Sequence, residues 1–137
     1  MPNGFSVLIT DRNRHVRNFL CRELIAEGYQ VEVAADGRDL LRKISKAGPS
    51  DLLILDLEIP YSGGPAILKR LRRVNSGLPV IIHGFATEDA SHPAVQRTAA
   101  FVEKMGNTDR LKAAVLEVLR EYYPDRCRTN HRERKEG

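Results

Sequence analysis

The chain has 137 residues, of which 42% are hydrophobic and 29% charged, and its formal net charge is +4. This composition is typical of one folded domain and argues against a disordered chain or a disulfide-held miniprotein. The apolar runs are far shorter than the roughly 20 residues that span a bilayer. Two cysteines without metal-like spacing, and an N-terminus unlike a signal peptide, favour a cytoplasmic protein without a membrane segment.

Strand and helix patterns alternate along the chain. Short apolar runs predict strands, and apolar residues at helical spacing predict helices. In chain order the predicted elements are a strand at 5–10, a helix at 13–27, a strand at 30–34, a helix at 37–47, a strand at 52–55, a loop at 57–63, a helix at 65–74, a strand at 79–82, an irregular segment at 84–98, a strand at 100–103 and a helix at 108–123.

Several expectations concern single residues. Helical spacing places Phe19 and Ile25 on the apolar face of the first helix and Val74 on that of the third. Thr108 is expected to cap the last helix. Pro93 is expected to break any long helix in the irregular segment.

These elements define the fold class. Alternating strands and helices predict a parallel α/β sheet, because each helix supplies the crossover between parallel strands. We expect five parallel strands with helices on both faces, in the flavodoxin-like strand order 2-1-3-4-5. In this order the first and third strands are neighbours, and ligands bind outside the carboxyl ends of the strands.

Polar residues follow the strands at that edge. Asp11 follows the first strand, Asp56 the third and Lys104 the fifth. A single aspartate in such a place is usually a turn or capping residue, but these three side chains are expected to converge. Two carboxylates and an ammonium suit a hard cation together with an anionic group. His83 ends the fourth strand, where a structural role is more common than a functional one.

Four segments carry a resemblance to a known family: VLITD at 7–11, DLLILDLEIP at 51–60, PVII at 79–82 and AAFVEK at 99–104. Through them, residues 5–121 resemble the receiver domain of two-component response regulators. The second segment is the most specific, because an apolar strand ends in Asp and is followed by Leu, any residue, an apolar residue and Pro.

The resemblance implies a role for each site residue. Asp56 would accept a phosphoryl group from the phosphohistidine of a histidine kinase, and Lys104 would pair with that group. Asp11, Asp56 and the main-chain carbonyl of Glu58 would hold Mg²⁺. Phe101 would be the aromatic residue whose rotamer reports activation. Physical chemistry agrees, because a carboxylate attacks an anionic phosphoryl donor only when cations screen the repulsion.

The chain also departs from the family's pattern near the site. Arg12 stands where the family usually has a second acidic metal ligand, which leaves two expectations: weaker Mg²⁺ binding, or a pairing of Arg12 with Asp56 that takes over part of the cation's role. Gly84 stands where a Thr or Ser usually contacts the phosphoryl group, and Phe85 follows it in place of a small residue. Thr87 would need a shifted loop to substitute, and Met105 replaces the Pro that usually follows the lysine.

The main hypothesis is a signalling receiver that is phosphorylated on Asp56 and acts through protein contacts rather than as an enzyme. Its partners would be a sensor histidine kinase or phosphotransfer protein, a downstream protein and, in one alternative, a second copy of the chain. A second hypothesis is a degenerate receiver that acts as a fixed interaction module, with Arg12 paired to Asp56. A flavin- or nucleotide-binding protein is disfavoured, because no phosphate-binding loop follows the first strand.

The chain is expected to divide into a receiver domain at 1–123 and a basic, polar tail or truncated linker at 124–137. The sequence-level pI is about 9.3, and basic clusters also occur at 12–17 and 69–73. Nucleic-acid binding is not favoured, because no aromatic residues alternate with these charges to stack on bases. Basic residues on a helix more often belong to a solvated face.

Overall fold

The computed structural model describes residues 4–45, 50–85, 88–104 and 107–128. Its strands form one five-stranded sheet in which all pairs are parallel and the order is β2-β1-β3-β4-β5. The strands are β1 (Ser6–Thr10), β2 (Gln30–Ala34), β3 (Leu52–Leu55), β4 (Val80–Gly84) and β5 (Ala100–Glu103). The predicted fold class and strand order are therefore confirmed.

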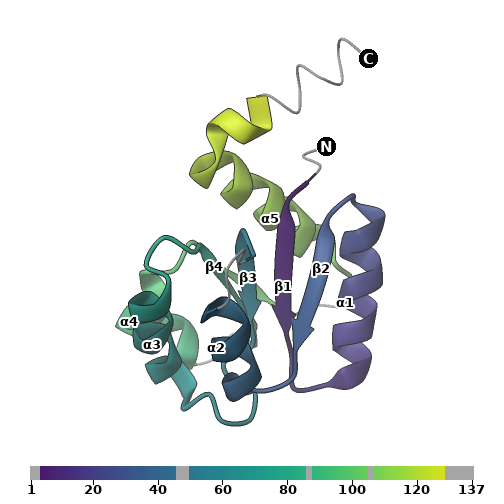
Figure 1. Ribbon diagram of the computed structural model, residues 1–137. Coiled ribbons are helices and arrows are strands. Elements are labelled where there is room, and N and C mark those ends of the chain that lie inside the picture. Colours follow the sequence, from purple (N-terminus) through teal and green to yellow (C-terminus); the bar gives the residue numbers. More distant parts are fainter. Residues whose placement is uncertain (1–3, 46–49, 86–87, 105–106, 129–137) are drawn as a thin grey trace.

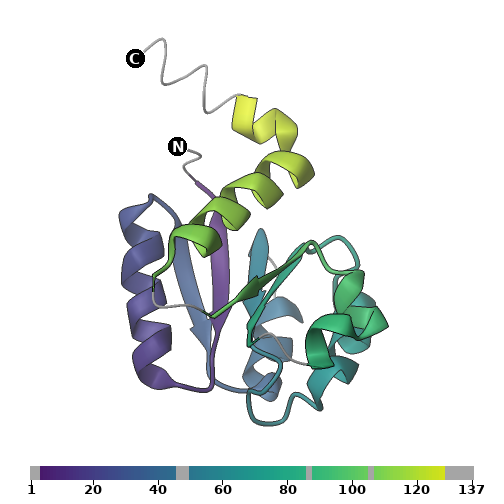
Figure 2. The ribbon, with the colours of Figure 1, turned by 180° about the vertical axis from the view of Figure 1, so that it is seen from behind.

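Helices cover both faces of this sheet (Figures 1 and 2). They are α1 (Arg14–Ala26), α2 (Gly37–Ser45), α3 (Ile67–Val74), α4 (Pro93–Gln96) and α5 (Asp109–Tyr122), with 3₁₀ turns η1 (Gly64–Ala66) and η2 (Glu88–Ser91). α1 and α5 lie on one face, and α2, α3 and α4 lie on the other. In the described ranges no helix is both long enough and apolar enough to cross a bilayer.

Local signals explain most helix ends. The Asn13 side chain accepts hydrogen bonds from the His15 and Val16 amides and so caps α1. As expected, no long helix runs through Pro93: it begins the short helix α4, where its missing N–H is no loss in the first turn. Thr108 occupies the N-cap position of α5 as expected, but its side chain makes no capping hydrogen bond and instead donates to Glu23 Oε1 at 3.0 Å.

Three predicted core residues are exposed. Phe19 and Ile25 of α1 are 39% and 55% accessible, and Val74 at the end of α3 is 43% accessible. Each lies at the margin of its helix's apolar stripe, and the sheet covers only the centre of that stripe, including Leu20, Leu24 and Leu71. Helical periodicity alone therefore predicted wider buried stripes than the structure has.

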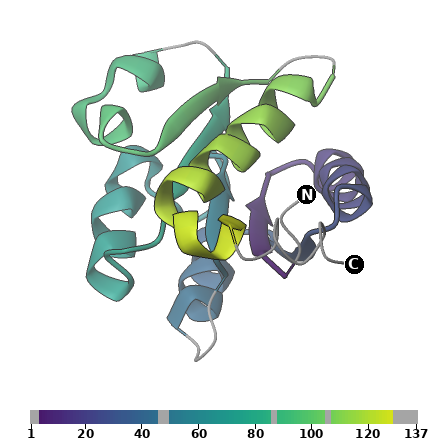
Figure 3. The ribbon, with the colours of Figure 1, turned by 90° about the horizontal axis from the view of Figure 1, so that it is seen from above.

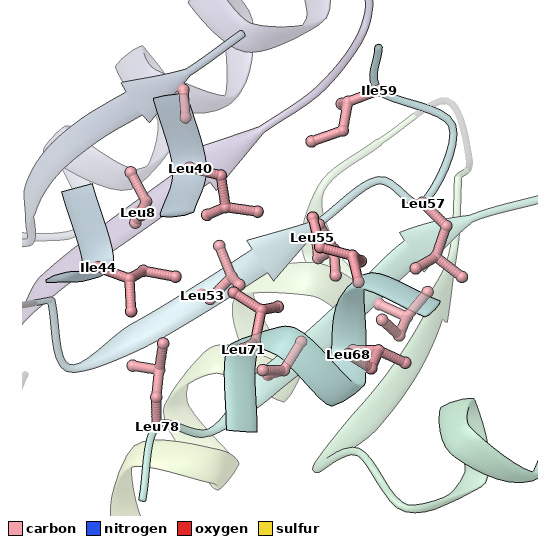
Figure 4. Close-up of a cluster of buried hydrophobic side chains, with 14 of the residues drawn as sticks. Leu8, Leu40, Ile44, Leu53, Leu55, Leu57, Ile59, Leu68, Leu71 and Leu78 are labelled. Atoms are coloured by element: carbon pink, nitrogen blue, oxygen red, sulfur yellow. The ribbon is translucent and has the colours of Figure 1, made fainter. Parts of the chain in front are cut away.

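The core consists of one apolar cluster on each side of the sheet. On one side, leucines and isoleucines from β1 and β3 meet those of α2 and α3, with Leu8, Leu53, Leu40 and Ile44 pointing toward one another in Figure 4. On the other side, strand residues pack against α1 and α5. Because β3 is covered on both faces, all four of its residues are buried.

Strand register places the two predicted aspartates side by side. Ile9 of β1 pairs with Ile54 of β3, and Asp11 and Asp56 each follow two residues later. β4 and β5 continue the sheet, so the residue after β5, Lys104, reaches the same edge. This edge lies at the bottom of the sheet in Figure 1.

The first residues after α5 pack at the opposite edge (Figure 3). Arg126 Nη1 lies 2.7 Å from Asp51 Oδ1, before β3, and its guanidinium lies 4.1 Å from the centre of the Phe5 ring. Tyr123 donates a hydrogen bond of 2.7 Å to the Asp51 carbonyl. Part of the segment expected to be a tail is thus held against the start of the sheet.

The loop between β3 and α3 is held close to the start of α2. Tyr61 adopts a positive φ of 60°, and the Arg38 guanidinium lies 3.7 Å from the centre of its ring. The Gly37 amide donates to the Pro60 carbonyl at 2.7 Å. A Cβ on Gly37 would lie 2.2 Å from the Tyr61 carbonyl oxygen, so this approach requires glycine.

We predict that Gly37→Ala destabilises the protein by about 2 kcal/mol or more, because a backbone group must shift to admit the methyl group. Urea unfolding monitored by circular dichroism measures the change. Gly77→Ala is the control, because its Cβ would meet only the Asn75 side chain at 3.9 Å. Equal stability of both variants would contradict the proposed close approach.

Candidate functional site

Lys104 joins the two aspartates at the carboxyl edge of the sheet. Its Nζ lies 2.8 Å from Asp11 Oδ2 and 3.1 Å from Asp56 Oδ2. Both carboxylates are almost completely buried, with side chains 1% and 3% accessible, whereas the lysine side chain is 13% accessible. The three residues expected to converge therefore form one compact ionic cluster.

The two oxygens of Asp56 have different surroundings. Oδ1 accepts a hydrogen bond of 2.9 Å from the Glu58 amide. Oδ2 faces Lys104 Nζ and also accepts from the Arg12 amide at 3.2 Å. The Asp56 amide donates to Thr10 Oγ1, which fixes the residue at the end of β3. These contacts hold the carboxylate in one orientation.

Asp11 is also fixed by its neighbours. Its Oδ1 accepts from the Asn13 amide at 2.8 Å, and its main-chain carbonyl accepts from Arg17 Nη1 at 2.7 Å. Among the described residues, the buried Oδ2 has no hydrogen-bond partner of good geometry, although Lys104 Nζ lies close enough for an ionic contact. This oxygen therefore keeps the capacity to bind a cation.

The oxygen atoms at this edge are of the type that Mg²⁺ prefers as ligands. Hard cations prefer carboxylate and carbonyl oxygens, and Asp11, Asp56 and the main chain at Glu58 are adjacent here. Within the part of the chain that the structure describes, no three side chains of His, Cys, Asp or Glu form a metal cluster. The candidate ligands that the described side chains offer at this edge are the carboxylates of Asp11 and Asp56.

Arg12 occupies the mouth of the site. Its Nη1 lies 2.5 Å from Glu58 Oε2, while its Nε lies 4.0 Å from Asp56 Oδ2. The Arg12 and Glu58 side chains are 44% and 51% accessible, so this ion pair lies in solvent above the buried carboxylates. The sequence suggested a pairing of Arg12 with Asp56, but the shorter contact is with Glu58.

The end of β4 contributes little polar chemistry. Gly84 has no side chain, and an added Cβ would meet nothing within 4 Å. A cavity of about 20 Å³ lies between it, Asp56 and Phe101. The centre of the exposed Phe85 ring lies 5.6 Å from Lys104 Nζ. Thr87 and Met105, two further residues singled out in the sequence, lie outside the described residues.

Phe101 lies between the site and the core. It is partly buried, packs against the apolar cluster on the α2, α3 and α4 side, and borders the small cavity next to Asp56. Its position is compatible with both an ordinary core residue and a side chain that responds to changes at Asp56.

His83 lies behind the site, paired in register with Val102. It is 7% accessible, and its Nδ1 has no hydrogen-bond partner among the described residues. Burial lowers the pKa of His83, and the positive charge of Lys104 lowers it further, against the opposing effect of the two aspartates. The folded protein therefore favours the neutral form of this side chain.

Sequence reasoning missed three supporting interactions. It assigned no role to Thr10, although a hydroxyl directly before Asp11 was visible at the end of a buried strand. It treated Arg17 only as part of a basic cluster. It also assigned Glu58 a carbonyl role and did not foresee its side-chain ion pair with Arg12.

Comparison with known proteins identifies the family. The family model of the response regulator receiver domain matches residues 7–116, so the chain belongs to this family of two-component signalling modules. The chain is 37% identical over 76 residues to the response regulator MprA of Mycolicibacterium vanbaalenii. It is 39% identical over 80 residues to the sensor protein EvgS of Escherichia coli.

These two matches cover 56% and 58% of the chain, but 32% of MprA and 7% of EvgS. The chain thus spans about a third of MprA and a small part of EvgS.

Solved structures agree with this assignment. The chain is similar to the response regulator TrrA of Thermotoga maritima, crystallised with Mg²⁺ and BeF, with a TM-score of 0.77 and 29% identity over 84% of this chain and 99% of TrrA. TrrA in complex with the histidine kinase ThkA gives a TM-score of 0.75 and 29% identity, over 84% and 98% of the two chains.

We predict that Arg12→Asp tightens Mg²⁺ binding by about tenfold or more, because a carboxylate replaces a positive charge beside the metal ligands. Isothermal titration calorimetry measures the affinity directly. Arg14→Asp is the control, because Arg14 is exposed and begins α1 without contacting Asp56. Unchanged affinity in Arg12→Asp would show that Arg12 does not limit cation binding.

We predict that His83 makes the protein less stable in mild acid. Because its pKa is lowered in the folded state, the unfolded chain binds the proton more tightly, and stability falls as the pH falls through about 6.5. Urea unfolding at about pH 7.5 and pH 5.5 should give a smaller loss for His83→Gln than for the wild type. His15→Gln, at an exposed position, should keep the wild-type loss, and a wild-type loss in His83→Gln would refute the assignment.

Proposed function

We propose that Asp56 is the phosphoacceptor of this receiver domain and that a sensor histidine kinase or phosphotransfer protein is the donor. The observation that carries this proposal is the asymmetric fixing of its carboxylate. The Glu58 amide holds Oδ1, while Oδ2 faces Lys104 at the edge of the sheet. The family membership and the TrrA complex with a histidine kinase support the same donor class.

In the proposed step, Asp56 Oδ2 attacks the phosphorus of a phosphohistidine. The new O–P bond forms as the N–P bond breaks, and the imidazole leaves with the electron pair of that bond and takes a proton from solvent. Lys104, already 3.1 Å from Oδ2, pairs with the transferred phosphoryl oxygens and offsets their charge. Glu58 keeps the other carboxylate oxygen in place through its amide.

Asp11, Asp56 and the main-chain carbonyl of Glu58 are the proposed Mg²⁺ ligands. The buried Oδ2 of Asp11, which contacts the Lys104 ammonium but accepts no hydrogen bond of good geometry from the described residues, supports this assignment, as does Mg²⁺ in the related TrrA structure. When bound, Mg²⁺ supplies positive charge that screens repulsion between the carboxylate and the phosphoryl donor. Arg12 adds a fixed positive charge at the same mouth and is expected to weaken the cation's binding.

The proposed output is a protein contact rather than an enzymatic reaction. A phosphoryl group on Asp56 adds charge and acceptor oxygens, which can shift a two-state surface. Phe101, beside the small cavity at Asp56, is the proposed reporter of this change, together with the segment that contains Gly84 and Thr87. The proposed setting is the cytoplasm, with a downstream protein or a second copy as the recipient.

A fixed interaction module is the second candidate function. The observation that favours it is the Arg12–Glu58 ion pair at the mouth, with Arg12 Nε 4.0 Å from Asp56. Gly84 also provides no side-chain hydroxyl for a phosphoryl oxygen. In this alternative, the ionic cluster stabilises one conformation that binds a partner without phosphorylation.

The deciding experiment is intact mass spectrometry after incubation with Mg²⁺ and a small-molecule phosphodonor. We expect the wild type to gain one phosphoryl group, Asp56→Asn to gain none, and chelation of Mg²⁺ to abolish the gain. Arg14→Asn, at an exposed position outside the cluster, serves as a substitution control. If the wild type gains no phosphoryl group while a verified receiver reacts in parallel, the fixed module becomes the better account.

A further inference from the structure

The outer side of α3 has an unbalanced positive charge. Residues 59–87 contain four basic residues and no Asp or Glu, and all four are exposed on α3: Lys69, Arg70, Arg72 and Arg73. None of them makes an ion pair with another described residue. The helix dipole favours cations in the last turn. It does not explain why these four basic residues have no acidic residue among them to balance their charge.

A surface hollow of about 250 Å³ lies beside the same helix. It is bordered by Arg72 of α3 and by Arg97, which directly follows α4. Leu71 and Leu78 also line it, and both belong to the apolar cluster in Figure 4. No carboxylate is among its described lining residues. The hollow therefore combines an apolar floor with two guanidinium groups that form no ion pair within the described part of the chain.

An exposed aromatic side chain extends this surface. Tyr122 of α5 lines the hollow and is 45% accessible. Tyrosine and arginine around an apolar depression are typical of protein interfaces. A nucleic-acid backbone would use the cations but would leave the apolar floor without a partner.

The chain's own C-terminal residues do not complement this surface. Residues 129–137 contain Arg132, Arg134 and Lys135 against Glu133 and Glu136, so their net charge has the same sign as the rim of the hollow. Charge complementarity instead favours an acidic occupant from another protein.

We propose that this hollow and the basic side of α3 form a docking site for an acidic protein segment. An apolar side chain of the partner enters the hollow, and flanking Asp or Glu residues pair with Arg72 and Arg97. Leu78 and Pro79 precede β4, so the site lies at the amino edge of the sheet. Asp56 lies at the opposite edge, and a partner bound here leaves the ionic cluster accessible.

Fluorescence anisotropy with a dye-labelled peptide tests this site. The probe has a central Leu-Phe pair flanked by glutamates. We expect it to bind the wild type, and Arg72→Glu combined with Arg97→Glu to weaken binding by about tenfold or more. The milder pair Arg72→Gln and Arg97→Gln should weaken it less. Arg14→Glu combined with Arg22→Glu makes the same charge change on exposed positions of α1 and should leave binding unchanged.

Two altered peptides measure the contributions of charge and of apolar contact to binding separately. Replacing the glutamates by glutamines, or the Leu-Phe pair by serines, should each weaken binding to the wild type. Failure of the original peptide to bind, or equal binding to the double-glutamate variant with unchanged circular dichroism, would overturn the proposal. Tighter binding of duplex DNA through the same arginines would overturn it in favour of a nucleic-acid surface.

Discussion

Two carboxylates buried side by side repel each other, and the Lys104 ammonium offsets that repulsion at the edge of this sheet. Its Nζ contacts both Asp11 and Asp56, although the lysine comes from the end of β5 and must pass the end of β4 to reach them. Removing the lysine would leave two uncompensated charges away from water, which is far more costly than an exposed broken pair. The ionic cluster therefore depends on a strand order that brings the ends of β1, β3 and β5 to one edge.

Arg12 changes the balance of this cluster. Three carboxylates, from Asp11, Asp56 and Glu58, meet two basic side chains, Arg12 and Lys104. Lys104 acts from inside the fold, whereas the ion pair of Arg12 with Glu58 is exposed to solvent and costs little to break. The inner cation therefore belongs to the folded framework, and the outer one is free to exchange partners when a ligand enters.

The fold and the convergence of the site residues were predicted well from the sequence. Both follow from buried strands that are directly followed by a polar residue. Side-chain partners were harder to predict. Thr108 has a capping residue's identity, but a nearby carboxylate on α1 accepts its hydroxyl instead. In the fixed-module hypothesis Arg12 was paired with Asp56; that contact is present at 4.0 Å, but the shorter contact, with Glu58, was not foreseen. Such choices depend on contacts between distant segments, which periodicity does not encode.

The turn after α5 has a mechanical consequence. Through Arg126 and Tyr123 it is tied to Asp51, whose carboxylate also accepts from the Ser6 amide. It therefore contacts the residues at the start of β1 and just before β3. These are the two strands whose far ends carry the aspartates. A load applied to the chain just beyond α5 would run along these strands as tension instead of peeling α5 away from the sheet.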